Sequence, residues 1–274
     1  MGILFLAAAA AHSAAEPSSS PAATANLQLV KTLDLSRTTK QPNAIVTDGR
    51  FIYVTDRTGG LYKYDAEGTL ITELSRLNND FFIAGDLAQD NEYLYLTDEL
   101  SKSVIKVNKQ LDLSAAHKIE LKNVELFNPS GLYIDKNQDI YLSDSAGDQV
   151  YCFNALGLLE WRRGLFGGAA QSLNTPGAIA VFENSPVVLD RGNRAVKKIS
   201  PDRLEILARH ADLLSLAAHK QNLFVGAGDG IYIYPAAARL ELAPGLYPAD
   251  LFIFNNLLYV LDSRQRKIWI YAIY

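Results

Sequence analysis

Tyr141-Leu-Ser-Asp144 is one copy of a four-residue pattern that returns along the chain and ends in an aspartate. The other copies are Tyr53-Val-Thr-Asp56, Tyr95-Leu-Thr-Asp98, Val187-Val-Leu-Asp190 and Tyr259-Val-Leu-Asp262, with a sixth, Phe224-Val-Gly-Ala227, in which the acid is replaced. The last residues of the six copies are separated by 42, 46, 46, 37 and 35 positions. A repeat of this length is typical of the blades of a β-propeller.

The residues around each copy also repeat. A second apolar quartet, such as Val150-Tyr-Cys-Phe153, follows after a short polar turn, and another, such as Gly131-Leu-Tyr-Ile134, precedes it. These runs are short and rich in β-branched and aromatic residues, which indicates strands and not helices. Small residues at the start of the first strand would let the strands crowd around a central axis. The sequence therefore predicts an all-β fold, a six-bladed β-propeller spanning residues 27–274.

The sixth repeat ends at Tyr274, directly after its third strand, and leaves the edge of that sheet open. Leu27 to Leu35 reads as a strand and has no partner in the first repeat. Because an open edge invites aggregation, we expect this segment to supply the missing outer strand, with Leu29 to Leu33 beside Ile268 to Tyr271. This 3+1 closure would join both ends of the propeller in the last blade.

The residues before the propeller resemble an export signal. Residues 1–15 carry no charge and contain an apolar run followed by small residues before Glu16, which is the pattern of a signal peptide or short hydrophobic leader. Residues 16–26 are rich in Pro, Ser and Ala and read as a linker. We therefore expect an exported protein, periplasmic or extracellular, without a membrane span but open to association with a membrane complex.

Composition excludes several classes of function. The chain has 30 acidic and 26 basic residues, a net charge of −4, which argues against nucleic-acid binding. The basic pairs Arg162-Arg163 and Lys197-Lys198 are expected to be solvated surface. The single cysteine, Cys152, excludes a disulfide framework and cysteine-rich metal sites, and its apolar surroundings predict a buried, inert thiol.

The repeats resemble a known family. Ile140-Tyr-Leu-Ser-Asp144 and Leu189-Asp-Arg-Gly-Asn-Arg-Ala-Val-Lys-Lys-Ile199 are similar to NHL repeats, and so is the lead-in Leu173-Asn-Thr-Pro-Gly177. The neighbouring families are the YWTD and lactonase-like propellers. The resemblance implies a six-bladed propeller, but the superfamily includes lyases, lactonases, receptor domains and interaction scaffolds, so it does not specify the function.

The repeated aspartates are the first candidates for chemistry, and the sequence favours a structural role for them. Each ends a strand before a turn, where a carboxylate commonly accepts backbone N–H groups. We therefore expect Asp56, Asp98, Asp144, Asp190 and Asp262 to stabilise the turns.

Histidines offer little for catalysis or metal binding. His12 lies in the leader, His117 and His210 in predicted outer strands, and His219 in a predicted hairpin, so none is expected on the inner strands that line the channel. The resemblance to lactonase-like propellers, which hold calcium with Glu, Asn and Asp at the channel mouth, keeps a Ca²⁺ site open as an alternative. Its candidate ligands would be Asn43, Asp86, Asn128, Asn174 and Asp250. Loop polarity without a cofactor is the preferred interpretation.

Aromatic and polar residues recur between each outer strand and the next inner strand. In a propeller these connections surround the channel mouth, the usual place for ligands. The expected ligand-binding face comprises Phe81, Phe82, Asp86, Phe127, Asn128, Phe166, Asn174, Tyr247 and Asp250. Burial of the aromatic rings between blades is the competing interpretation.

The sequence therefore predicts a non-catalytic binding or scaffold propeller, monomeric by itself, that presents this face to a protein or peptide partner. The alternative is a metal-dependent, lactonase-like or lyase-like enzyme that uses the channel mouth.

Overall fold

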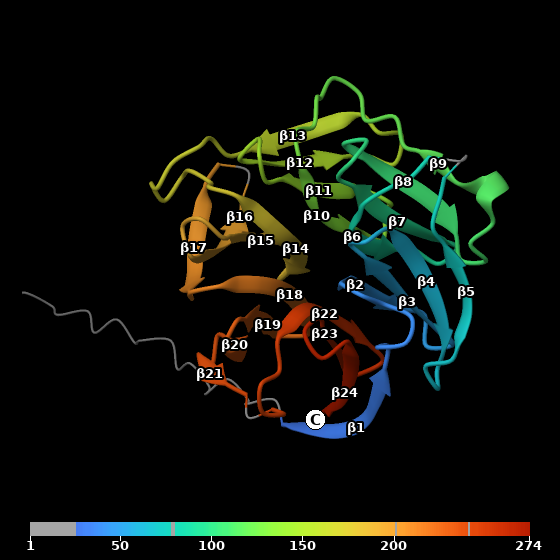
Figure 1. Cartoon of the computed structure of the whole chain (residues 1–274). Coiled ribbons are helices and arrows are strands. Elements are labelled where there is room, and N and C mark those ends of the chain that lie inside the picture. The colour runs from blue at the N-terminus through green and yellow to red at the C-terminus, as the bar shows by residue number, and fades with distance from the viewer. Residues whose placement is uncertain (1–25, 78–79, 201, 241) are drawn as a thin grey trace, which may run out of the picture.

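The computed structural model describes residues 26–77, 80–200, 202–240 and 242–274 and contains six four-stranded antiparallel sheets arranged around a central axis (Figure 1). The predicted six-bladed β-propeller is confirmed. The predicted leader, residues 1–15, and nearly all of the predicted linker lie outside the described residues. Within the described part of the chain, no helix has the length and apolar character needed to cross a membrane.

Each blade runs from an inner strand at the axis to an outer strand at the rim. Blades 1 to 3 comprise β2 (Pro42–Thr47), β3 (Phe51–Asp56), β4 (Gly60–Asp65), β5 (Leu70–Leu74); β6 (Ala84–Gln89), β7 (Tyr93–Asp98), β8 (Ser103–Asn108), β9 (His117–Lys118); and β10 (Pro129–Ile134), β11 (Ile140–Asp144), β12 (Gln149–Phe153), β13 (Leu159–Arg163). Blades 4 to 6 comprise β14 (Pro176–Phe182), β15 (Ser185–Asp190), β16 (Ala195–Ile199), β17 (Leu204–Arg209); β18 (Leu213–His219), β19 (Asn222–Ala227), β20 (Gly230–Tyr234), β21 (Ala238–Arg239); and β22 (Pro248–Phe254), β23 (Leu257–Asp262), β24 (Lys267–Ile273), β1 (Leu27–Asp34). One 3₁₀ turn, Leu113–Ala115, precedes β9.

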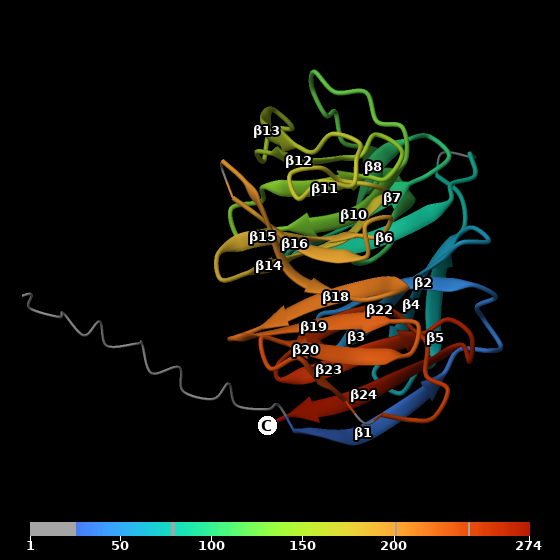
Figure 2. The same cartoon turned by 90° about the vertical axis from the view of Figure 1, so that its left-hand side faces the viewer.

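The N-terminal strand closes the ring. β1 pairs antiparallel with β24, with Leu29 opposite Tyr271 and Leu33 opposite Ile268, as the sequence predicts. Figure 2 shows the two strands side by side at the outer edge of blade 6. The closure therefore leaves the last blade with four strands, like the other five.

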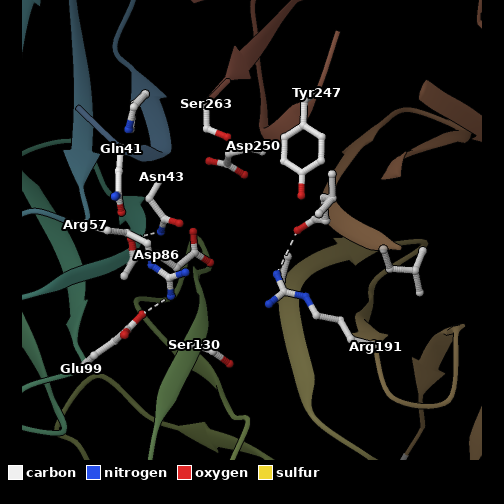
Figure 3. Close-up of a pocket in the computed structure, with 16 residues that line it drawn as sticks. Gln41, Asn43, Arg57, Asp86, Glu99, Ser130, Arg191, Tyr247, Asp250 and Ser263 are labelled. Carbon is white, nitrogen blue, oxygen red and sulfur yellow. Dashed lines mark hydrogen bonds and ion pairs between the residues drawn. The ribbon is translucent and has the colours of Figure 1, made fainter. Parts of the chain in front are cut away.

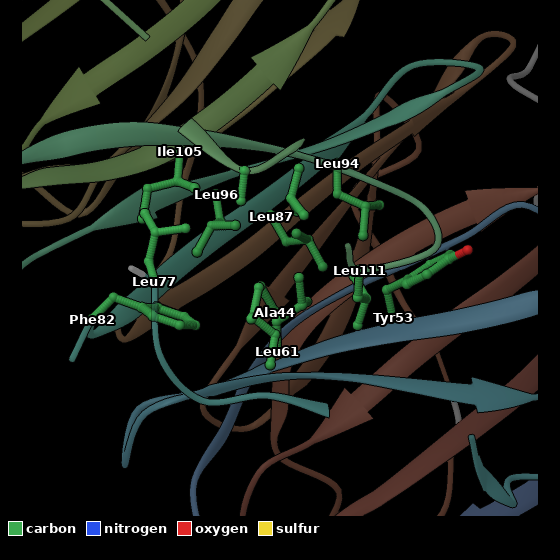
Figure 4. Close-up of a cluster of buried hydrophobic side chains, with 14 of the residues drawn as sticks. Ala44, Tyr53, Leu61, Leu77, Phe82, Leu87, Leu94, Leu96, Ile105 and Leu111 are labelled. Atoms are coloured by element: carbon green, nitrogen blue, oxygen red, sulfur yellow. The ribbon is translucent and has the colours of Figure 1, made fainter. Parts of the chain in front are cut away.

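The core is divided among the interfaces between blades. Between blades 1 and 2, for example, Tyr53 and Leu61 pack against Leu87, Leu94 and Ile105 (Figure 4). These side chains are buried, and burial of such apolar surface supplies the main stabilisation of the fold. Each of these apolar clusters is formed by side chains from two adjacent blades. Each blade is therefore stabilised by its contacts with its neighbours in the ring.

The inner strands approach one another closely, and each begins with a β-bulge. A Cβ on Gly131 would lie 2.2 Å from the carbonyl oxygen of Gly177 in the next blade, so only glycine fits there. The pairing with the second strand shifts register at the first residues of all six inner strands, for example between Pro248 and Asp250. A bulge redirects side chains locally, and here it turns them toward the mouth of the channel.

The repeated aspartates join each turn to the loop that enters the blade, which confirms their structural role. The Asp144 carboxylate accepts N–H groups from Phe127 and Asn128 in the entering loop and from Gly147 in the turn. Burial acts to raise the pKa of Asp56, but the Thr58 hydroxyl and the N–H groups of Thr58, Gln41 and Lys40 donate to the carboxylate, outweigh burial and lower that pKa.

In blade 4 the aspartate has a second partner. The Asp190 carboxylate forms an ion pair of 2.8 Å with Lys197, and both side chains are at most 1% exposed. Lys197 also donates to the carbonyl oxygen of Ser172, in the glycine-rich loop that covers it. The prediction that this lysine is solvated is wrong, because its ammonium group ties that loop to the blade.

Candidate binding site at the channel mouth

A cavity of about 420 Å³ lies where the inner strands begin, at the mouth of the channel. Its wall combines charged, polar and apolar side chains (Figure 3): Gln41, Pro42, Asn43, Arg57, Gly85, Asp86, Glu99, Ser130, Ala178, Arg191, Leu213, Leu214, Tyr247, Ala249, Asp250 and Ser263. A second cavity of about 300 Å³ continues along the channel and is lined mainly by aliphatic residues of the inner strands. The two cavities share Asp86, Ala178 and Asp250, so these residues mark the boundary between polar mouth and apolar channel.

Two positions of the repeat supply all five charged residues of the cavity wall. Asp86 and Asp250 are each the third residue of their inner strand, Asp86 within the bulge and Asp250 directly after it. Arg57, Glu99 and Arg191 each directly follow a repeated aspartate, in the turn between the second and third strands. The two positions lie close together because, in an antiparallel blade, the first strand begins on the same face as the turn between the second and third strands.

Polar side chains also join the inner parts of neighbouring blades around the mouth. Each of the six blade interfaces has at least one such hydrogen bond: Asn43 to the Gly85 carbonyl, the Leu132 N–H to Asp86, Ser130 to the Pro176 carbonyl, Arg191 to the Leu214 carbonyl, Ser215 to the Pro248 carbonyl, and the Ile45 N–H to Asp250. The site therefore sits on a rigid ring, which suits a preorganised binding surface.

The pKa values of the two aspartates at the mouth, Asp86 and Asp250, are both raised. Burial raises the pKa of Asp86 to about 6, although the carboxylate accepts N–H groups from Leu132 and Leu87 and lies near Arg191. Burial and then repulsion from Asp86 raise the pKa of Asp250 well above its usual range. The ionised form of each aspartate therefore stays destabilised. Loss of hydration and mutual repulsion outweigh the two backbone donors on each carboxylate and the nearby guanidinium.

Arg191 is the cation that faces both aspartates. Burial lowers its pKa and the charge of Asp86 opposes this effect, yet the side chain still contacts the open space of the cavity. A Cβ on Gly177 would lie 2.5 Å from the Arg191 Nε, so glycine leaves the space in which the guanidinium lies. Across the cavity, Arg57 forms an ion pair with Glu99.

The structure brings together only some of the predicted site residues. Asp86, Tyr247 and Asp250 line the cavity, as does Asn43, and the Tyr247 hydroxyl points toward the open space (Figure 3). Asn128 and Asn174 do not line it; their side chains bond Ser145 and Thr175.

The predicted aromatic residues divide into exposed and buried. Phe81, Phe127 and Phe166 are 62%, 52% and 75% exposed, and we call these three the aromatic rim. They lie in three successive connections, those that enter blades 2, 3 and 4. Phe82 is 2% exposed and packs in the core between blades 1 and 2, so it does not belong to the surface.

The described histidines lie away from the mouth, but one prediction about them is wrong. His219 is the last residue of the inner strand β18 and not a hairpin residue; it lies at the end opposite the mouth. Across the described residues, no three His, Cys, Asp or Glu side chains form a group that could hold a metal ion. Burial raises the pKa of the Cys152 thiol to about 12, so this thiol is an unreactive part of the core.

Sequence reasoning missed Arg57, Glu99 and Arg191 as site residues. The signal was the position directly after each repeated aspartate, which varies while the aspartate recurs. A repeated scaffold residue with a variable neighbour is typical of a site built on a rigid fold.

Comparisons with solved structures agree with the fold. A protein of unknown function from Bacteroides thetaiotaomicron aligns with a TM-score of 0.69 and 15% identity over 92% of this chain and 76% of its own. A putative gluconolactonase aligns with a TM-score of 0.65 and 15% identity, over 92% of this chain and 93% of its own.

A virginiamycin B lyase from Staphylococcus aureus, crystallised with quinupristin as an inactive histidine-to-alanine variant, gives a TM-score of 0.62 and 16% identity over 90% of this chain and 89% of its own. No family model and no curated protein matches the sequence. At such identities the likeness establishes the propeller fold, with lyase and lactonase-type propellers as structural neighbours, and does not carry a reaction over to this chain.

Proposed function

We propose that this protein is a non-catalytic binding module whose channel-mouth face holds a protein or peptide partner. The observation that carries the proposal is the aromatic rim, three strongly exposed phenylalanines in connections on the same face of the ring as the mouth cavity. The apolar residues 1–15 support a place of action in the periplasm or outside the cell.

What distinguishes the aromatic rim is its repetition, because three successive connections on one face each expose a phenylalanine. The exposed rings of Phe127 and Phe166 cannot form conventional hydrogen bonds with water. The Phe81 ring contacts the Arg76 guanidinium, which lies 4.1 Å from the ring centroid. Aromatic residues are enriched at binding surfaces, where they bury large areas at low conformational cost. A peptide lying across blades 2 to 4 would cover the rim and reach the cavity.

Photo-crosslinking tests this proposal. A benzoylphenylalanine in place of Phe127 should crosslink a partner in the native cell. The matched control is the same probe in place of Leu156, which is 75% exposed but lies in a hairpin on the opposite face. A specific product with the Phe127 probe alone supports the proposal; equal labelling at both positions, or none at either, contradicts it.

A metal-dependent enzyme of lactonase or lyase type is the second candidate. The observation that favours it is the Asp86 carboxyl, whose pKa burial raises to about 6 within a cavity, as is common at catalytic sites. Metal analysis of the purified protein distinguishes the two: one Ca²⁺ or Zn²⁺ per chain, lost in an Asp250→Asn variant, would support the enzyme and count against the scaffold.

A further inference from the structure

The charges that line the mouth do not balance. Three carboxylates, Asp86, Glu99 and Asp250, face two guanidiniums, Arg57 and Arg191. Arg57 pairs with Glu99 at the rim of the cavity, which leaves Arg191 alone with two aspartates. With every group ionised, the inner part of the cavity therefore has one negative charge in excess.

The excess charge lies at the deepest point of the polar cavity. Asp86 and Asp250 flank blade 1 from its two neighbours, and beyond them the channel is apolar. Among the polar residues of the mouth, Pro42, Leu213 and Ala249 contribute apolar surface to the wall. A ligand entering from outside thus passes a wall of mixed polar and apolar side chains and meets the two aspartates where the apolar channel begins.

We propose that the mouth binds one primary ammonium group on an aliphatic stem, the side chain of a lysine in the peptide partner, with the ammonium between Asp86 and Asp250. This inference rests on the proposed function and names the group that the partner inserts. The single positive charge matches the single excess carboxylate, and three N–H donors suit two carboxylates and a neutral oxygen such as that of Asn43.

Other cations fit this wall less well. A divalent metal needs more oxygen ligands than two aspartates provide, and no group of three His, Cys, Asp or Glu side chains in the described part of the chain offers them. A quaternary ammonium requires an aromatic cage, whereas the aromatic side chain in this wall is Tyr247, whose face is covered by the Arg264 guanidinium at 3.8 Å.

Ammonium binding should be coupled to proton release. The two aspartates are influenced by Arg191, and Arg191 in turn by Arg57 and Tyr247, with Glu99 paired to Arg57. Burial raises the pKa of Asp86 to about 6, and burial together with repulsion from Asp86 raises the pKa of Asp250 well above its usual range, so an incoming ammonium displaces any proton that the aspartate pair holds. Affinity should therefore rise as the pH increases from 5 to 7.5.

Calorimetric titration of the full chain with an acetyl-Gly-Lys-Gly-amide peptide tests the proposal. The lysine peptide should bind, with proton uptake by the buffer, at least about tenfold more tightly than the same peptide with norleucine, which has the stem without the charge. Asp250→Asn and Asp86→Asn should each weaken binding about tenfold, whereas Glu205→Gln, on the exposed outer strand β17, should not.

Several results would overturn it. These are equal binding of the lysine and norleucine peptides, unchanged binding in both aspartate variants, affinity independent of pH in the unmodified protein, or Ca²⁺ that binds and displaces the peptide. If n-butylamine binds as tightly as the peptide, the site recognises a free amine, and the assignment to a lysine of a peptide partner is overturned. The pH series needs no variant, so misfolding of Asp250→Asn would leave the proposal testable.

The crosslinking experiment separates this inference from the proposed function. If the Phe127 probe captures the partner equally well in the Asp250→Asn protein, the binding face stands and the lysine assignment fails. If no partner is captured in either protein while the lysine peptide still binds, the proposed protein partner fails and the ammonium site stands.

Discussion

Asp144 and Asp250 are both aspartates enclosed by the ring of blades, but their surroundings differ. Asp144 ends a second strand, is 0% exposed and accepts three backbone N–H groups. Asp250 follows a bulge in an inner strand, accepts two N–H groups and borders a cavity together with a second acid. The same residue type therefore has two environments in the repeat: Asp144 holds a turn with three N–H donors, whereas Asp250 has two donors and a side that borders the cavity, where we propose that it binds a ligand.

The largest expected effect concerns the one turn aspartate that relies on a buried cation. Lys197→Met would leave Asp190 charged and buried without its partner and should lower the free energy of unfolding by about 3–5 kcal/mol. Lys198→Met is the matched control, because its partner Glu183 is exposed to solvent and such a pair is worth at most about 1 kcal/mol. Urea unfolding measures both. Equal losses would mean that the buried pair contributes no more than the surface pair.

Removal of the two aspartates compared above should have unequal effects. Asp144→Ala leaves three half-buried N–H donors without an acceptor and should cost about 3 kcal/mol in the free energy of unfolding. Asp250→Ala leaves two donors beside a cavity that water can enter, so we expect a loss of about 1 kcal/mol. An equal or larger loss for Asp250→Ala would assign both residues the same structural role.

The pH dependence of stability should have opposite signs for a turn aspartate and a mouth aspartate. The pKa of Asp86 is raised to about 6 in the folded protein, so its contribution is fully present below the unfolded value near 4 and is lost as the pH rises through 6. The pKa of Asp56 is lowered, so its contribution is present above about pH 4 and is lost at lower pH.

Urea midpoints from pH 3 to pH 8 for Asp86→Asn and Asp56→Asn, each compared with the unmodified protein, check these signs. Asn91→Ser, in an exposed turn, controls for mutation without a change in ionisable groups. Stability differences that change with pH in the same direction for both aspartates would contradict the contrast.

The smallest effect on stability is expected at the aromatic rim. Phe127→Ser should change the free energy of unfolding by no more than about 0.5 kcal/mol, because the ring is already exposed. The same variant should reduce partner capture, whereas Leu156→Ser on the opposite face should not. Unchanged capture by Phe127→Ser would remove the rim from the binding surface.

The sequence predicted the fold because the repeat is visible in it. The spacing of the terminal aspartates defines the blades, and the unpartnered segment from Leu27 defines the closure. Asp86 and Asp250 could also be predicted from the sequence, because they stand at equivalent positions at the start of inner strands.

The remainder of the site depends on long-range packing. Lys197 looks solvated in sequence, and only the fold of the loop around Ser172 over it makes it buried. The direction of Arg191 depends on the space left by Gly177, and Phe81 and Phe82 are neighbours with opposite environments. Local pattern does not contain this information, because each case is decided by a residue in another part of the repeat.

The closing strand also determines how the ring responds to tension. β1 and β24 are antiparallel, with Leu27 opposite Ile273 and Asp34 opposite Lys267, and the Tyr274 N–H bonds the Asn26 carbonyl at the same end of the ladder. A pull on the two chain ends would therefore peel these strands apart rung by rung, and would not load all the rungs at once. Blade 6 would be the first to open, and the other five would follow only after losing a neighbour.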